Sequence, residues 1–295
     1  MRFVVLLVGL SGLCCAAPAA AECNLSAAPA APLVHVTYDP FGPTQQVLDL
    51  SVQLRNSGDE PCQARLYVRP SAGQLVLESS GDRLNMRLEG QEGAGAAQAG
   101  EFGPYVITLA PAQSTTLLVR AVVPPQQVVP RGTYTGDFAL RLEDGDGREI
   151  SLAGGGVRLQ ANVLARTEMS ISGSSAARLA GGGMAPSGIA FGAAHSGQTE
   201  RAYVNVWSNG SVTVSLSSEN GGVLKLIDNP ALPPIRYSTR FDGSDLSLEA
   251  PASLVRTPPM TVGGASYELA LTLGDIARNF AGQYQDVITV TVTPN

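Results

Sequence analysis

Cysteine and histidine are the side chains that could supply reactive or metal-binding groups in this chain, and both are scarce. The sequence contains four cysteines and two histidines: Cys14, Cys15, Cys23, Cys62, His35 and His195. Metalloprotease and hydrolase sites need such groups at fixed spacing, as in H-E-x-x-H or G-x-S-x-G, and neither pattern occurs. We therefore expect no catalytic residue, no metal site, no cofactor and no enzymatic activity.

Carboxylates occur in pairs, but at turns. The segment Asp144-Gly145-Asp146-Gly147 has the opening of a calcium-binding loop, yet it lacks the further carboxylates and the closing glutamate that such a loop needs. We interpret it as a hairpin turn. Asp286 lies on the apolar side of a predicted strand, and we expect it to bond backbone N–H groups near the strand's entrance rather than a ligand.

The first 21 residues have the pattern of a secretory signal peptide. Arg2 provides the positive charge, residues 3–13 the apolar core and residues 19–21 a run of alanines, so cleavage is expected after Ala21. A lipoprotein signal is the alternative, because Cys14 follows the apolar run. Leu13 is a poor fit to the small residue that lipoprotein processing requires before the cysteine.

Removal of the signal peptide leaves Cys23 and Cys62. In an oxidising compartment, a single pair of cysteines is most simply one disulfide. In the chain-entropy model, closing a loop of about 40 residues contributes roughly 4 kcal/mol to stability.

The composition excludes several classes of partner. Of 295 residues, 15% are charged and the net charge is −6, with Lys225 as the only lysine. This balance argues against nucleic acid or an anionic membrane as the main partner. The 33 glycines and 20 prolines favour short strands and many turns over long helices.

Apolar and polar residues alternate in many short segments, which predicts an all-β chain. The clearest examples are 48–54, 64–68, 115–123, 134–142, 202–206, 212–216, 267–273 and 284–292. A Gly/Ala-rich loop is expected at 89–103, a Pro-bracketed turn at 124–130, and a further loop at 179–188.

Two landmarks indicate an internal repeat. Gly132-x-Tyr134, with Asp137, recurs as Gly282-x-Tyr284 with Asp286, and Asn56 in an early turn matches Asn209. The chain is therefore predicted to contain, after the signal peptide 1–21, two similar domains at 22–165 and 166–295. Strands and turns at this spacing favour immunoglobulin-like β-sandwiches.

The two copies differ after their Gly-x-Tyr strand. In the first, a hairpin partner follows up to Val163, whereas in the second the sequence has only a few residues left. We expect the second sandwich to be incomplete and to lack its last strand. The apolar face of its final strand, Tyr284, Ile288, Val290 and Val292, would then form one wall of a groove for a strand from another protein.

These residues resemble a known family. The segment from Gly282 to Val292, preceded by 208–210 and 218–222, is similar to the spore coat protein U-like domain found in subunits of archaic chaperone–usher pili. Tyr38-Asp39-Pro40-Phe41, between the two cysteines of the first domain, is also typical of that family.

The resemblance implies donor-strand chemistry. A periplasmic chaperone would first lend a strand beside the C-terminal one, and at the outer-membrane usher the N-terminal extension of the next pilin subunit would replace it. Ordinary subunits carry that extension before their first cysteine, whereas here Cys23 follows the expected cleavage site almost directly. The resemblance therefore implies a tip adhesin at the cell surface, exported through the periplasm.

In such a tip subunit the first domain would attach to a host or abiotic surface, for instance in biofilm formation. Its loops are the expected contact, with Phe102, Tyr105, Val128 and Val129 as candidate residues. The alternative is a secreted or periplasmic protein of two sandwiches that binds a protein or polysaccharide without polymerising.

Overall fold

The computed structural model describes residues 23–29, 31–90, 97–98, 100–152, 155–172 and 188–295. The predicted signal peptide, the centre of the Gly/Ala-rich loop and most of the 179–188 loop lie outside these ranges. All regular elements within them are β-strands, as predicted, and they form four sheets. No helix in this part of the chain is long and apolar enough to cross a membrane.

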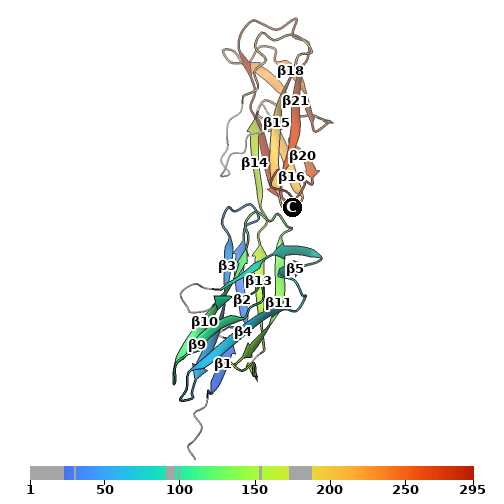
Figure 1. Cartoon of the computed structure of the whole chain (residues 1–295). Coiled ribbons are helices and arrows are strands. Elements are labelled where there is room, and N and C mark those ends of the chain that lie inside the picture. The colour runs from blue at the N-terminus through green and yellow to red at the C-terminus, as the bar shows by residue number, and fades with distance from the viewer. Residues whose placement is uncertain (1–22, 30, 91–96, 99, 153–154, 173–187) are drawn as a thin grey trace, which may run out of the picture.

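The first two sheets face each other across one core, in the lower half of Figure 1. One sheet has the order β1-β3-β10-β7, and the other β2-β13-β11-β4-β9-β8, with β5, β6 and β12 at its side. The strands are β1 Leu25–Pro29, β2 Leu33–Tyr38, β3 Gln46–Asn56, β4 Cys62–Pro70, β5 Val76–Ser79, β6 Asp82–Asn85, β7 Arg87–Gly90, β8 Ala97–Gln98, β9 Tyr105–Leu109, β10 Ser114–Val123, β11 Gly132–Glu143, β12 Glu149–Ile150 and β13 Gly156–Val163. This order is that of a complete immunoglobulin-type sandwich.

The alternation read in the sequence is the reason these strands pack. In β3, Leu48, Leu50, Val52 and Leu54 are all buried, while the residues between them face outward. Cys62 at the start of β4 is joined to Cys23 by a disulfide, which ties the segment before β1 to the opposite sheet.

The other two sheets enclose a second core. They have the orders β14-β15-β21-β18-β17-β22, with β19 beside β18, and β20-β16-β23. The strands are β14 Thr167–Ser172, β15 Thr199–Ser208, β16 Val212–Ser218, β17 Val223–Leu226, β18 Ile235–Phe241, β19 Ser244–Leu246, β20 Ala252–Arg256, β21 Ala265–Leu273, β22 Tyr284–Gln285 and β23 Ile288–Pro294. No described sheet mixes strands from both sides of the predicted boundary at 165, although the division into two independently folding domains stays a prediction.

The Gly-x-Tyr landmark marks the same corner in both sandwiches. Gly132 and Gly282 share an uncommon backbone φ of +153°. Two residues later, the Tyr134 hydroxyl donates to the carbonyl of Pro130 at 3.0 Å, and the Tyr284 hydroxyl donates to that of Phe280 at 3.1 Å. Such a tyrosine corner fixes the start of the strand that corresponds to strand F, the sixth of seven, in an immunoglobulin-like sandwich. Here these strands are β11 in the first sandwich and β22 continuing into β23 in the second, and both are called the sixth strand below.

Asn56 and Asn209 are also buried at matching places, but they hold different parts of the chain. The Asn56 side chain donates to the carbonyls of Glu60 and Ala110 and so closes loops of its own sandwich. Asn209 binds three groups outside the second sandwich's own sheets.

The three partners of Asn209 lie at the junction between the sandwiches. Its amide nitrogen donates to the carbonyls of Leu164, at 2.8 Å, and Val129, at 3.2 Å, and its oxygen accepts from the N–H of Arg166 at 2.8 Å. Arg166 also forms an ion pair with Asp39 at 3.0 Å. A buried amide with three partners of this kind fixes the linker 164–166.

We predict that Asn209→Ala loosens this linker. Loss of the amide leaves three backbone groups without their hydrogen-bond partner. A buried polar group left unpaired costs about 1–3 kcal/mol of stability. Trypsin cleavage after Arg166 should then become about tenfold faster, since cleavage tracks the opened population. Asn56→Ala is the matched control and should not change the rate at Arg166. An unchanged rate in Asn209→Ala would show that the side chain does not hold the linker.

Candidate functional site

Strand β23 has one paired edge and one unpaired edge. It pairs antiparallel with β16 from Ser218↔Ile288 to Val212↔Pro294, and no described strand pairs with its other edge. Its counterpart β11 pairs with β4 on one side and with β13 on the other. No described strand of the second sandwich therefore pairs with β23 as β13 pairs with β11, and β14, which comes near β23, forms no ladder with it.

The unpaired edge shows in the burial of the inward side chains. In β11, Tyr134, Phe138 and Leu142 are no more than 1% exposed. The matching Tyr284, Ile288 and Val292 are only partly buried, and Val290 alone is buried, at 7% exposure. These four residues are the predicted groove wall, and they do share one face.

Beside this edge the structure contains a groove of about 620 Å³. Tyr284, Ile288 and Val290 line one side, whereas Val292 packs against the core beyond the groove's end. The floor belongs to the opposite sheet, with leucines of β21 and Ile235 and Tyr237 of β18. Residues 188–192 form the other rim, where Ile189 and Phe191 pack against the core.

Asp286 also lines the groove, between Tyr284 and Ile288, and four donors hold its carboxylate. Oδ2 accepts from the hydroxyls of Ser218, at 2.6 Å, and Tyr237. Oδ1 accepts from the backbone N–H groups of Asn220, at 3.0 Å, and Val287, at 2.8 Å. The expectation that Asp286 bonds backbone N–H groups is confirmed, and the carboxylate also joins the two sheets through Tyr237.

Tyr237 is held in its neutral, donating form. Burial raises the pKa of its hydroxyl well above the usual value of 10.0, and the hydrogen bond to Asp286 raises it further. The hydroxyl therefore stays protonated at neutral pH and donates to the carboxylate across the sandwich.

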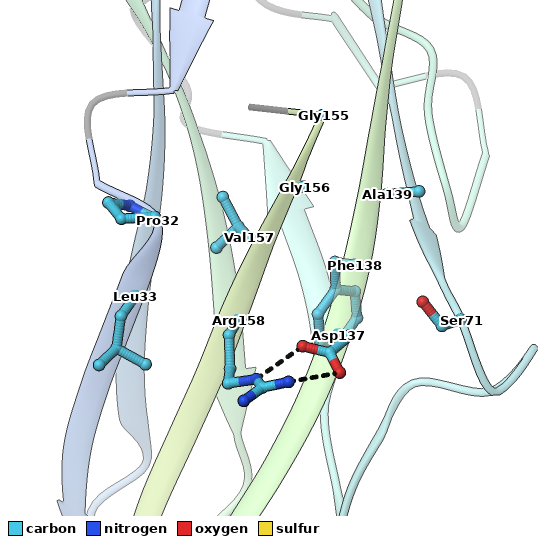
Figure 2. Close-up of a pocket in the computed structure, with 10 residues that line it drawn as sticks. All are labelled: Pro32, Leu33, Ser71, Asp137, Phe138, Ala139, Gly155, Gly156, Val157 and Arg158. Carbon is cyan, nitrogen blue, oxygen red and sulfur yellow. Dashed lines mark hydrogen bonds and ion pairs between the residues drawn. The ribbon is translucent and has the colours of Figure 1, made fainter. Parts of the chain in front are cut away.

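In the first sandwich, β13 pairs with the edge of β11 that corresponds to the unpaired edge of β23. Figure 2 shows Leu33 of β2, Arg158 of β13 and Asp137 of β11 on neighbouring strands around a shallow hollow. Arg158 donates to both carboxylate oxygens of Asp137, at 2.7 and 3.0 Å, and this lowers the pKa of Asp137. Both side chains are exposed, so the pair adds little stability.

Asp137 and Asp286 are therefore not equivalent, contrary to their pairing in the repeat. Asp137 lies five residues after its glycine and faces solvent, whereas Asp286 lies four residues after and faces the groove. A shift of one residue moves a strand side chain to the other face. The counterpart of Asp137 is Val287, which is 52% exposed.

The candidate adhesive residues do not gather on one surface. Tyr105 is the first residue of β9 and has no exposed surface, and burial raises its pKa to about 12, so the prediction that it contacts a partner surface is wrong. Phe102 is partly buried against the first core. Val128 is partly buried, and Val129 contacts Asn209 at the junction between the sandwiches.

The remaining reactive groups stay apart. His35 lies on β2 and His195 in the loop before β15, on different sandwiches. Among the described residues no group of three His, Cys, Asp or Glu could hold a metal ion. The expected absence of enzymatic activity stays a prediction.

Sequence reasoning missed the floor of the groove. The alternation of Leu269, Leu271 and Leu273 predicted their strand, but it could not show that this strand lies opposite the open edge. Tyr237 carried no signal of its role, because its partner Asp286 is distant in sequence. The strand β17 was not predicted either.

We predict that Asp286→Ala destabilises the second sandwich by about 1.5–3 kcal/mol, since hydrogen bonds to a charged group are lost. Urea unfolding followed by the fluorescence of Trp207 measures this directly, because the only tryptophan is buried in β15. Asp245→Ala is the control, since that carboxylate binds Arg240 at an exposed site and should matter little. Equal effects of the two substitutions would contradict the role of Asp286.

The solved structures to which the chain is similar include tip adhesins of chaperone–usher pili. The CsuC–CsuE chaperone–tip adhesion subunit pre-assembly complex from archaic Csu pili of Acinetobacter baumannii is 14% identical, with 92% of this chain and 99% of that chain covered and a TM-score of 0.42. The CupB6 tip adhesin from Pseudomonas aeruginosa is 12% identical, with 92% and 96% covered and a TM-score of 0.36. No family model and no curated protein matches the sequence.

Proposed function

We propose that the chain is a subunit of a chaperone–usher pilus whose second sandwich accepts a strand from another protein. A periplasmic chaperone lends the first strand, and the N-terminal extension of the next pilin subunit replaces it at the outer-membrane usher. The observation that carries this proposal is the unpaired edge of β23 beside a groove whose wall is mostly apolar.

Strand addition fits this edge for two physical reasons. The outer edge of β23 leaves backbone N–H and C=O groups for a ladder with a new strand. The groove offers partly buried apolar side chains at every second position, apart from Asp286. Burying one large apolar side chain contributes about 1.5–3 kcal/mol, so a strand with a few such anchors would add as much as a small domain's whole stability.

For the first sandwich we propose the role of adhesin at the pilus tip. Its sixth strand already has its partner β13, and the disulfide and β1 belong to its own sheets, so it needs no strand from outside. A self-contained sandwich on a fixed linker suits attachment to a host or abiotic surface. Export through the periplasm and display at the cell surface belong to the same proposal.

A protein of two sandwiches that never polymerises is the competing function. It would bind a protein or polysaccharide through its loops, and its groove would have no partner strand. The two functions differ in what stabilises the second sandwich, which makes them separable by experiment.

We predict that the full chain is stabilised when an alternating apolar strand is fused after Asn295. Each anchor that enters the groove should add about 1.5–3 kcal/mol to the unfolding free energy reported by Trp207. A fused strand with serine at all anchor positions is the control. A full chain that is equally stable with either fusion would favour the non-polymerising function.

We also predict that Ile288→Asp with Val290→Asp abolishes co-purification with the cognate chaperone. A carboxylate facing the apolar groove is desolvated without a partner when a strand is added. Thr289→Asp with Thr291→Asp places the same charges on the exposed face of β23 and should leave the complex intact. Chaperone binding that survives the first pair would rule out this groove as the binding site.

A further inference from the structure

We propose that Asn220 is a modification site, where spontaneous deamidation converts the side-chain amide into a carboxylate beside Asp286. Two Asn-Gly dipeptides occur in the chain, Asn209-Gly210 and Asn220-Gly221, and their surroundings in the structure differ. Asn220 lies in the turn between β16 and β17, within the second sandwich itself. The modification is therefore independent of whether the groove accepts a strand.

An asparagine followed by glycine can react with its own backbone, because glycine has no side chain to hinder close approach. The backbone nitrogen of Gly221 forms a bond to Cγ of Asn220, the bond between Cγ and Nδ2 breaks, and ammonia leaves with the proton of the Gly221 N–H. Water then opens the succinimide ring at either carbonyl and yields aspartate or isoaspartate. The reaction consumes only water and needs no oxidant or reductant.

Both reacting groups of Asn209-Gly210 are held by hydrogen bonds. Asn209 is 2% exposed, and its amide nitrogen donates to two backbone carbonyls at the junction between the sandwiches. The N–H of Gly210, which would be the nucleophile, donates to Ser208 Oγ at 3.3 Å. Ring closure at Asn209 therefore requires a local opening of the junction.

The same groups of Asn220-Gly221 are more available. The Asn220 side chain is partly exposed, and its nitrogen donates in one long hydrogen bond, to the Gln285 carbonyl at 3.3 Å. Within the part of the chain that the structure describes, the Gly221 N–H has no hydrogen-bond partner. A Cβ on Gly221 would meet nothing closer than the Glu249 carbonyl, at 3.8 Å, so the turn has room for the ring.

Deamidation at Asn220 would change the hydrogen bonds around Asp286. The backbone N–H of Asn220 donates to Asp286 Oδ1 at 3.0 Å, so the new carboxylate would branch from the atom next to this donor. A carboxylate has no N–H for the Gln285 carbonyl, and it repels the Asp286 carboxylate. Isoaspartate would also lengthen the backbone before Gly222, whose N–H donates to Ser218 Oγ at 2.7 Å.

The first test incubates the full chain at neutral and at mildly alkaline pH and follows both dipeptides by peptide mass spectrometry. In the folded chain, Asn220 should convert at least about tenfold faster than Asn209, because Asn209 reacts only from an opened state. The rate at Asn220 should rise with pH, since the deprotonated nitrogen is the nucleophile. In urea the two rates should become similar. Equal rates in the folded chain, or no conversion at Asn220, would overturn the proposal.

The second test measures the effect on the second sandwich with Asn220→Asp, which carries one product of the reaction. Its unfolding constant, read from Trp207 in urea, should be about tenfold larger than that of the unmodified chain. Asn229→Asp is the matched control, because Asn229 is exposed and its Oδ1 accepts from the Ala231 N–H, as an aspartate also would. Equal effects of the two substitutions would overturn the proposed effect on Asp286. Neither test uses an added strand, so their failure is distinguishable from a failure of strand acceptance.

Discussion

A β-sandwich is stable only when the apolar inward faces of its strands are covered, and an inner strand such as β11 achieves this with a paired neighbour on each edge. The first sandwich meets this constraint within the chain, since β13 covers β11 and buries four of its own residues. The second has the same sixth strand with the same tyrosine corner, but the outer edge of β23 is unpaired. Burying one large apolar side chain contributes about 1.5–3 kcal/mol. A strand with several such side chains can therefore contribute as much free energy as the net stability of a small domain. The partner strand would therefore be part of the fold.

The buried asparagine that recurs in both sandwiches binds different parts of the chain in each. Asn56 at the end of β3 and Asn209 just after β15 each place a buried amide where backbone carbonyls outside the sheets gather. In the first sandwich these carbonyls belong to its own loops. In the second they belong to the linker and to the 124–130 turn of the first sandwich, so the same side chain joins two units. The local sequence places an asparagine at this position, but its hydrogen-bond partners depend on which backbone segment lies beside it.

The sequence predicted the parts of the structure that follow from short-range periodicity. Alternation indicated the long strands, Gly-x-Tyr indicated the repeat, and the comparison of the two copies indicated the open edge. It could not predict contacts between distant strands, such as Tyr237 with Asp286, because a period of two says which face a residue takes and not what lies opposite. For the same reason the alternation predicts the strand that begins at Tyr105, but it does not show that the Tyr105 side chain is fully covered by the core. The strand β17 is short and lies between polar turns, and its pattern is too brief to stand out.

Asp286 gives the groove something that apolar residues alone do not. A groove with uniform aliphatic walls accepts a strand equally well after a slip of two residues, because such a slip keeps every side chain on its face. Among the inward residues from Tyr284 to Val292, Asp286 is the polar one, and its four hydrogen bonds are complete without a partner strand. The position of the Asp286 carboxylate is therefore fixed. A strand displaced by two residues would bring a different side chain next to it. In the proposed strand acceptance, the apolar positions would supply the affinity.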